Sequence, residues 1–267
     1  MVGLHHLVEG EGEPLLLIQG MSGTHVSWGE PFLGALHARG LQTIRYDHRG
    51  TGRSGRVAAP FTIVELAEDA AGLLDELGLP SAHVLGISMG GMVAQELALR
   101  TPQRVRTLAL GCTYCGGPEG RLTDEPIAQR LAESLRSGDR ERALAVAYEL
   151  NLSERFRAHE ERFASFHEMA TTLPVAVEVI MLQMQAIFGH DTSARVHEIR
   201  ASTLVIHGTE DQMLPVGNGE LIARLIPGAR LELLEGVGHM FWWEEPERSA
   251  ELVAEHASAS VAGGGRA

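Results

Sequence analysis

Six short, almost wholly apolar runs recur along the chain, separated by longer segments. Because a strand buried on both faces shows no polar alternation, such runs predict strands of a parallel sheet. The segments between them have helical period, which predicts right-handed crossovers and an α/β fold with a mostly parallel central sheet and helices on both faces. The runs are PLLLIQG (14–20), LQTIRYD (41–47), HVLGIS (83–88), VRTLALGC (105–112), STLVIHG (202–208) and RLELLEG (230–236).

Two helices have clear boundaries in the sequence. FTIVELAEDAAGLLDELG is amphipathic, with Thr62 and Glu65 spaced as a capping box and Gly78 suited to the helix end. GMVAQELALR predicts a second helix. It should end before Pro102, because a proline disfavours helical backbone at the residue that precedes it.

Residues 114–200 break the alternation, since they contain helical segments and no strand-like run. We therefore expect a core formed by residues 1–113 and 201–258, with a helical cap of residues 114–200 inserted between two strands. The low-complexity end ASASVAGGGRA predicts a loose tail over 259–267.

Charge and composition narrow the class of function. The 267 residues carry 22 basic and 35 acidic side chains, a net charge of −13 that repels nucleic acid. No lysine occurs, which excludes Schiff-base and serine–lysine chemistry. No apolar run reaches the ~20 residues of a membrane span, and the N-terminus does not resemble a signal peptide. We expect a cytoplasmic monomer or homodimer that acts on a small molecule, without membrane or nucleic-acid partners.

The stretch GISMGG places Ser88 between a predicted strand and a predicted helix. Gly86-Ile87-Ser88-Met89-Gly90 fits the nucleophile-elbow pattern G-x-S-x-G, in which the serine occupies a strained turn and its neighbours are small. The alternative is a serine that only caps the helix. The strand before it and the helix after it favour the elbow.

A serine nucleophile needs a base, and the base needs an orienting carboxylate. Asp211 follows one predicted strand and His239 follows the next, so both lie at the edge of the sheet where parallel strands end. Glu210 and Asp47 are the rival acids. His207 also lies at a strand end, and we interpret it as structural.

The stretches RYDHRGTGRS, GISMGG, HGTEDQMLP and GVGH resemble, in sequence, order and spacing, the landmarks of the α/β-hydrolase fold family over nearly the whole chain. The resemblance implies that Ser88 is the nucleophile, Asp211 the acid and His239 the base, in that family's chain order. It also implies an oxyanion hole made by the backbone N–H groups of Met21 and Met89. Where many relatives have His-Gly before the first donor, this chain has Gln19-Gly20.

Two other motifs suggest cofactor or redox chemistry but lack the context for it. GTGRSG (50–55) matches a dinucleotide-binding pattern, yet the segment after it reads as a loop and not as the required helix. CTYC (112–115) has redox spacing but opens no helix, so Cys112 and Cys115 are interpreted as packing thiols. His5, His6 and His25 lack metal-ligand spacing in the sequence, and we expect neither a metal nor a cofactor.

The expected reaction is cofactor-independent hydrolysis of a small to medium, largely apolar carboxylic ester or lactone through an acyl-enzyme. The cap region and LIQGMSGTH resemble enol-lactonases and methylesterases. Cleavage of a β-diketone-type carbon–carbon bond or perhydrolysis would use the same triad, and a non-catalytic receptor on the same fold is the alternative of another class. The expected pocket residues are Gln19, Met181, Met184, Phe188, Met240 and Trp242.

Overall fold

The computed structural model describes residues 3–57 and 59–263, and its centre is a seven-stranded sheet in the order β1-β3-β2-β4-β5-β6-β7. β1 pairs antiparallel with β3, and every other pair is parallel. All six predicted strands are confirmed, and β1 is an additional four-residue edge strand. The strands are β1 (His6–Glu9), β2 (Glu13–Ile18), β3 (Leu41–Tyr46), β4 (Ala82–Ile87), β5 (Val105–Gly111), β6 (Ser202–Gly208) and β7 (Arg230–Leu234).

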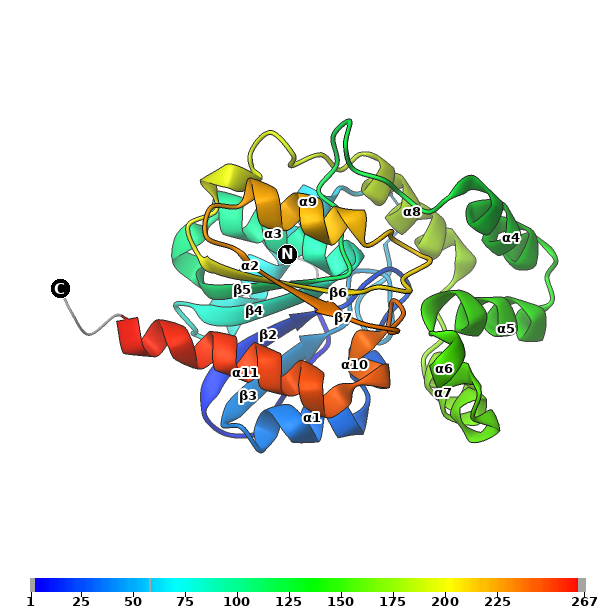
Figure 1. Cartoon of the computed structure of the whole chain (residues 1–267), viewed down its shortest axis with the longest axis horizontal. Coiled ribbons are helices and arrows are strands. Elements are labelled where there is room, and N and C mark those ends of the chain that lie inside the picture. The colour runs from blue at the N-terminus through cyan, green and yellow to red at the C-terminus, as the bar shows by residue number, and fades with distance from the viewer. Residues whose placement is uncertain (1–2, 58, 264–267) are drawn as a thin grey trace.

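Helices cover both faces of this sheet (Figure 1). On one face lie α2 (Ile63–Glu76), α3 (Met89–Arg100) and α9 (Gly217–Leu225), and on the other lie α1 (Glu30–His37) and α11 (Pro246–Gly263). Successive residues of β2 point to opposite faces, so Leu16 and Ile18 pack into the first layer while Leu15 and Leu17 pack into the second. The uniformly apolar runs are therefore explained by burial on both sides, and the predicted α/β class is confirmed.

The predicted start and end of α2 are also present. The Thr62 hydroxyl accepts a hydrogen bond from the Glu65 backbone N–H, and the Glu65 carboxylate accepts one from the Thr62 N–H, which completes the capping box. Gly78, just beyond the helix end, has φ +67°, a conformation that glycine adopts without a steric cost.

Between β5 and β6 the described chain is helical and forms a lobe beside the core (Figure 1). We keep the name cap for residues 114–200. Its α-helices are α4 (Glu125–Arg136), α5 (Arg140–Asn151), α6 (Glu154–Arg157), α7 (Glu160–Thr172) and α8 (Val177–Phe188). The remaining helices of the described chain are η1 (His25–Trp28), η2 (Pro102–Arg104), η3 (Val196–Glu198) and α10 (Phe241–Glu244).

The loose tail expected over 259–267 needs correction. Helix α11 continues to Gly263, and residues 264–267 lie outside the described part of the chain. Alanine has the highest helix propensity, so an alanine-rich end prolongs a helix already anchored by buried residues such as Val253 and Ala257.

Within the described ranges no single helix is both long and apolar enough to cross a membrane. Only α7 and α8 taken together, bent by 95° at their junction, reach that length and apolarity.

Candidate active site

Ser88 occupies a strained turn between β4 and α3. Its φ of +54° and ψ of −123° lie in a region that side chains other than glycine rarely adopt, at a cost of about 1–3 kcal/mol. The Ser88 N–H donates to the Gly111 carbonyl at 2.9 Å, and the Thr113 hydroxyl donates to the Ser88 carbonyl at 2.6 Å. Hydrogen bonds therefore hold both the backbone N–H and the backbone carbonyl of Ser88, which is half-buried.

The glycines around Ser88 are required by close backbone contacts. A Cβ on Gly86 would lie 2.3 Å from the Gly90 carbonyl oxygen, and one on Gly90 would lie 2.1 Å from the Ile18 carbonyl oxygen. Both distances are shorter than any real contact, so helix α3 can begin against the strands only where these side chains are absent. This explains the G-x-S-x-G spacing, and a serine that merely capped a helix would not need it.

The turn after β2, residues 20–23, lies against Ser88. A Cβ built on Gly20 would be 3.0 Å from the Ser88 Cβ and 3.5 Å from its hydroxyl oxygen. This turn carries Met21, one of the two expected oxyanion donors. Met89, the other, is the first residue of α3, where a backbone N–H has no acceptor within the helix.

Asp211 and His239 meet at the edge of the sheet where β6 and β7 end. The His239 ring donates from Nδ1 to the Asp211 Oδ2 at 2.7 Å, which leaves Nε2 as the acceptor nitrogen. The other carboxylate oxygen accepts from the backbone N–H groups of Met213 and Leu214 at 2.8 and 2.9 Å. His207 lies on the same carboxylate, with Nε2 3.2 Å from Oδ2, and also donates to the Leu214 carbonyl.

These contacts keep the buried Asp211 carboxylate ionised. Burial alone would raise its pKa, but the pairing with His239 and the hydrogen bond from His207 outweigh burial and hold the pKa well below its ordinary value. The rival acids do not occupy this place. Glu210 is exposed, and Asp47 pairs with a different histidine.

The loop that carries His239 is held by the Glu244 carboxylate and the Asn151 carbonyl, and no sequence motif indicates either contact. The Glu244 carboxylate accepts from the Gly238 and Ser153 backbone N–H groups at 2.9 and 2.8 Å, and from the Ser153 hydroxyl. The Met240 N–H donates to the Asn151 carbonyl at 3.0 Å. Burial raises the pKa of Glu244 against the effect of these bonds. Since Asn151 and Ser153 belong to the cap, the cap contacts the loop that carries the expected base.

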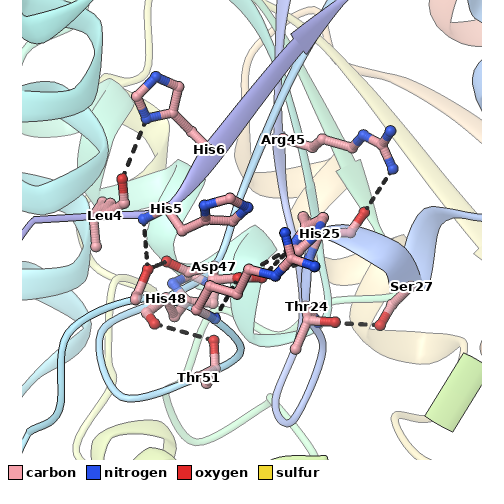
Figure 2. Close-up of polar contacts among 12 residues, drawn as sticks. Leu4, His5, His6, Thr24, His25, Ser27, Arg45, Asp47, His48 and Thr51 are labelled. Atoms are coloured by element: carbon pink, nitrogen blue, oxygen red, sulfur yellow. Dashed lines mark hydrogen bonds and ion pairs between the residues drawn. The ribbon is translucent and has the colours of Figure 1, made fainter. Parts of the chain in front are cut away.

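A second buried histidine–carboxylate pair joins η1 to the end of β3 (Figure 2). The His25 ring Nδ1 lies 2.9 and 3.0 Å from the two Asp47 oxygens, which also accept from the His25 and Arg53 backbone N–H groups at 2.7 and 2.8 Å. Behind this pair, the His48 Nε2 donates to the Gln19 carbonyl at 2.8 Å. These bonds tie together the loops that support the turn after β2.

The Asp47 carboxylate of this pair also explains the conformation of the GTGRSG loop, residues 50–55. Gly52 has φ +50°, and a Cβ there would lie 2.2 Å from the Asp47 carboxylate. The motif wraps around that carboxylate, and the next helix begins only at Ile63. The structure therefore explains Gly52 by its close contact with the Asp47 carboxylate.

Two groups of three potential metal ligands occur in the described residues. His5 comes within 4.8 Å of the His25–Asp47 pair, and Cys112 comes equally close to His207 and Asp211. In each group the carboxylate oxygens already accept hydrogen bonds from backbone N–H groups and a histidine ring. We assign no metal to either group.

The two cysteines are free and buried. Burial raises the pKa of the Cys112 thiol, the neighbouring Asp211 carboxylate raises it further, and burial raises that of Cys115 to about 11. Both are therefore thiols at neutral pH, as packing groups should be.

The expected pocket residues lie in three different settings. Gln19 and Met240 are buried, and Met184 is half-buried. Met181 and Phe188 on α8 are 55% and 67% exposed, so they do not form an enclosed wall. Trp242 is also buried: its ring packs on Trp28 with centroids 5.8 Å apart, and its indole N–H donates to the Ser27 carbonyl.

The chain resembles known proteins over almost its full length. The family model for the alpha/beta hydrolase fold matches residues 13–246. RutD of Azorhizobium caulinodans, provisionally named a carbamate hydrolase, is 32% identical over 94% of this chain and 93% of its own length. The rhodomycin D methylesterase DnrP of Streptomyces peucetius is 32% identical over 95% of both chains. The crystal structure of the enol-lactonase from Burkholderia xenovorans superposes with a TM-score of 0.83 at 25% identity, covering 96% of this chain and 97% of that one.

The chain belongs to the α/β-hydrolase fold family. It is a hydrolase, with relatives named for hydrolysis along nearly its whole length.

Proposed function

We propose that this hydrolase cleaves a carboxylic ester or lactone through an acyl-enzyme formed on Ser88. One observation carries the proposal: the buried His239–Asp211 pair lies at the same edge of the sheet as the strained Ser88 turn. A nucleophile, a base with a fixed tautomer and an ionised orienting group are what this reaction requires.

In the proposed reaction, His239 accepts the Ser88 proton as the hydroxyl oxygen attacks the carbonyl carbon. The bond to the leaving oxygen then breaks, and His239 returns the proton to the departing alcohol. A water molecule repeats both steps on the acyl-enzyme and releases the acid. Asp211 holds the Nδ1 proton of His239 throughout, so that Nε2 is the nitrogen that moves protons.

Negative charge on the attacked carbonyl oxygen is stabilised by the backbone N–H groups of Met21 and Met89. Each donor contributes about 3 kcal/mol when its direction is fixed before the reaction. A backbone N–H donor does not depend on the side chain of its residue, so methionine is compatible with this role at both positions.

The choice of an ester or lactone draws support from the relatives. They are named for a methyl ester, an enol-lactone and a carbamate, in each of which a heteroatom leaves a carbonyl carbon. Buried Met240 and half-buried Met184, two of the expected pocket residues, are apolar, which favours a largely apolar substrate of small to medium size.

The test is labelling with a fluorophosphonate followed by intact mass. We expect one adduct on the wild-type protein and none on Ser88→Ala. A folded wild-type protein that stays unlabelled would contradict the proposal and favour a non-catalytic receptor.

A substrate panel then separates the reactions that this triad could serve. Esters and lactones should turn over, and β-diketones should not. A neutral ester should react faster than a charged isostere, because a charge must lose its hydration in an apolar site. Preference for the charged ester or the diketone would contradict the substrate class.

A further inference from the structure

Three of the four backbone N–H groups in the turn after β2 are already bonded. The Gly20 N–H donates to the Gln19 side-chain Oε1 at 3.0 Å, and the Gly23 N–H donates to the Gly20 carbonyl at 3.2 Å. The Ser22 N–H donates at 2.9 Å to the Oε1 of Gln183, which comes from cap helix α8. Across the described residues, the Met21 N–H alone in this turn has no acceptor.

These bonds fix the direction of the free N–H. The Met21 N–H belongs to the peptide plane between Gly20 and Met21. The plane before it is held by Gln19 through the Gly20 N–H, and the plane after it is held by Gln183 through the Ser22 N–H. Two glutamine side chains, one from the core and one from the cap, therefore hold the planes on either side of it.

The turn needs such support because Ser22 is strained. Its φ of +59° is a conformation that serine adopts at a cost. Without an acceptor for its N–H, Ser22 would be free to relax, and the direction of the Met21 N–H would change with it.

The Gln183 side chain is poorly suited to a purely structural role. It is fully buried, its Oε1 is occupied by Ser22, and its Nε2 has no partner among the described residues. An unpartnered buried donor lowers stability, so an apolar side chain of similar length would serve folding better. What the amide supplies is the acceptor for Ser22.

We propose that Gln183 is a positioning residue through which the cap sets the oxyanion hole. This inference rests on the proposed function and adds a specific role for the cap. Helix α8 supplies the contact that points the Met21 N–H at the substrate, so the hole is complete only when α8 is docked on the turn.

The experiment compares Gln183→Met with Gln185→Met, the same substitution two residues along on the exposed side of α8. Gln183→Met should lower kcat about 10- to 100-fold, less than the complete loss of an oxyanion donor, and leave KM nearly unchanged. Its Tm should stay close to that of the wild type, because the lost hydrogen bond from the Ser22 N–H is offset by removal of the unpartnered Nε2. The affinity for a trifluoromethyl ketone, which forms an oxyanion on Ser88, should fall in parallel with kcat. Gln185→Met should match the wild type.

Gln183→Glu separates positioning from packing. Its carboxylate can accept from Ser22, but its negative charge opposes the charge that forms in the hole. The ratio of its kcat to that of the wild type should therefore rise as the pH is lowered and the glutamate becomes protonated. A purely structural role would give no such dependence on pH.

The outcomes distinguish this inference from the proposed function. If the wild type labels at Ser88 but Gln183→Met keeps the wild-type kcat and ketone affinity, the inference is overturned. A drop in Tm with an unchanged kcat overturns it equally, because the role would then be structural. If the wild type itself does not label, the proposed function fails first.

Discussion

The buried pairs His239–Asp211 and His25–Asp47 have nearly the same geometry, and we assign them to different tasks. The His239 Nδ1 lies 2.7 Å from Asp211, and the His25 Nδ1 lies 2.9 Å from Asp47. Each carboxylate follows a parallel strand and also accepts two backbone N–H bonds. What differs is the surroundings: the first pair shares an edge with the Ser88 turn, whereas the second is enclosed by the GTGRSG loop. A buried His–Asp contact is therefore not by itself the sign of a triad.

The largest expected effect comes from the first pair. Asp211→Asn should lower kcat about 10⁴-fold, because the amide stabilises the wrong tautomer of His239 and cannot balance its charge. Steady-state kinetics measures the loss, and circular dichroism should show an intact fold.

The matched control for this variant is Glu210→Gln, which removes the neighbouring exposed carboxylate. It should keep the wild-type kcat. Full activity of Asp211→Asn together with loss in Glu210→Gln would show that the acid has been misassigned.

In the second pair, Asp47→Asn should lower Tm and leave kcat unchanged. Breaking a buried pair by removing one partner's charge costs about 3 kcal/mol, which for a chain of this size lowers Tm by roughly 6–12 °C. Thermal unfolding measures the shift. The kcat per site labelled by fluorophosphonate should stay at the wild-type value, and a loss of kcat at unchanged Tm would remove the distinction between the two pairs.

Buried His190 sharpens the comparison because its ring contacts the Thr192 hydroxyl at 3.3 Å and not a carboxylate. Burial lowers the pKa of His190 to about 4, although Glu96 and Asp191 oppose the shift and Arg195 adds to it. The unfolded chain, with an ordinary pKa of 6.5, binds more protons between these values. Stability is therefore lost as the pH falls from 6.5 towards 4.

This histidine should account for about 2 kcal/mol of the stability lost between pH 7.5 and pH 5. His190→Gln should make that loss smaller by the same amount. Chemical denaturation of both proteins at the two pH values measures it. An equal loss in the variant would show that His190 is not the titrating group.

The parts of the fold that could be predicted have local signals. Buried strands appear as uniform apolar runs, the capping box of Thr62 and Glu65 spans three residues, and the G-x-S-x-G spacing reflects contacts near Gly86 and Gly90. Strand β1 was missed because four residues at an edge show too little pattern. The end of α11 was missed because low complexity outweighed the helix propensity of alanine.

The remaining features depend on contacts between distant residues. Nothing near Gln183 indicates that it meets Ser22, 161 positions away, and nothing in the sequence joins His25 to Asp47. Only the folded chain brings such side chains together, so the positions of Ser88, Asp211 and His239 could be predicted while the groups that hold them could not.

The distance along the chain between Ser22 and Gln183 has a consequence for folding. Contacts between distant residues form late, because a long loop must close before they can be made. A refolding chain should regain its secondary structure before it reacts with a fluorophosphonate. A chain synthesised only through β5 would carry Ser88 without the cap and without His239 and Asp211, which we propose as its base and acid. We therefore expect it not to react with a fluorophosphonate until nearly all of its residues have been joined.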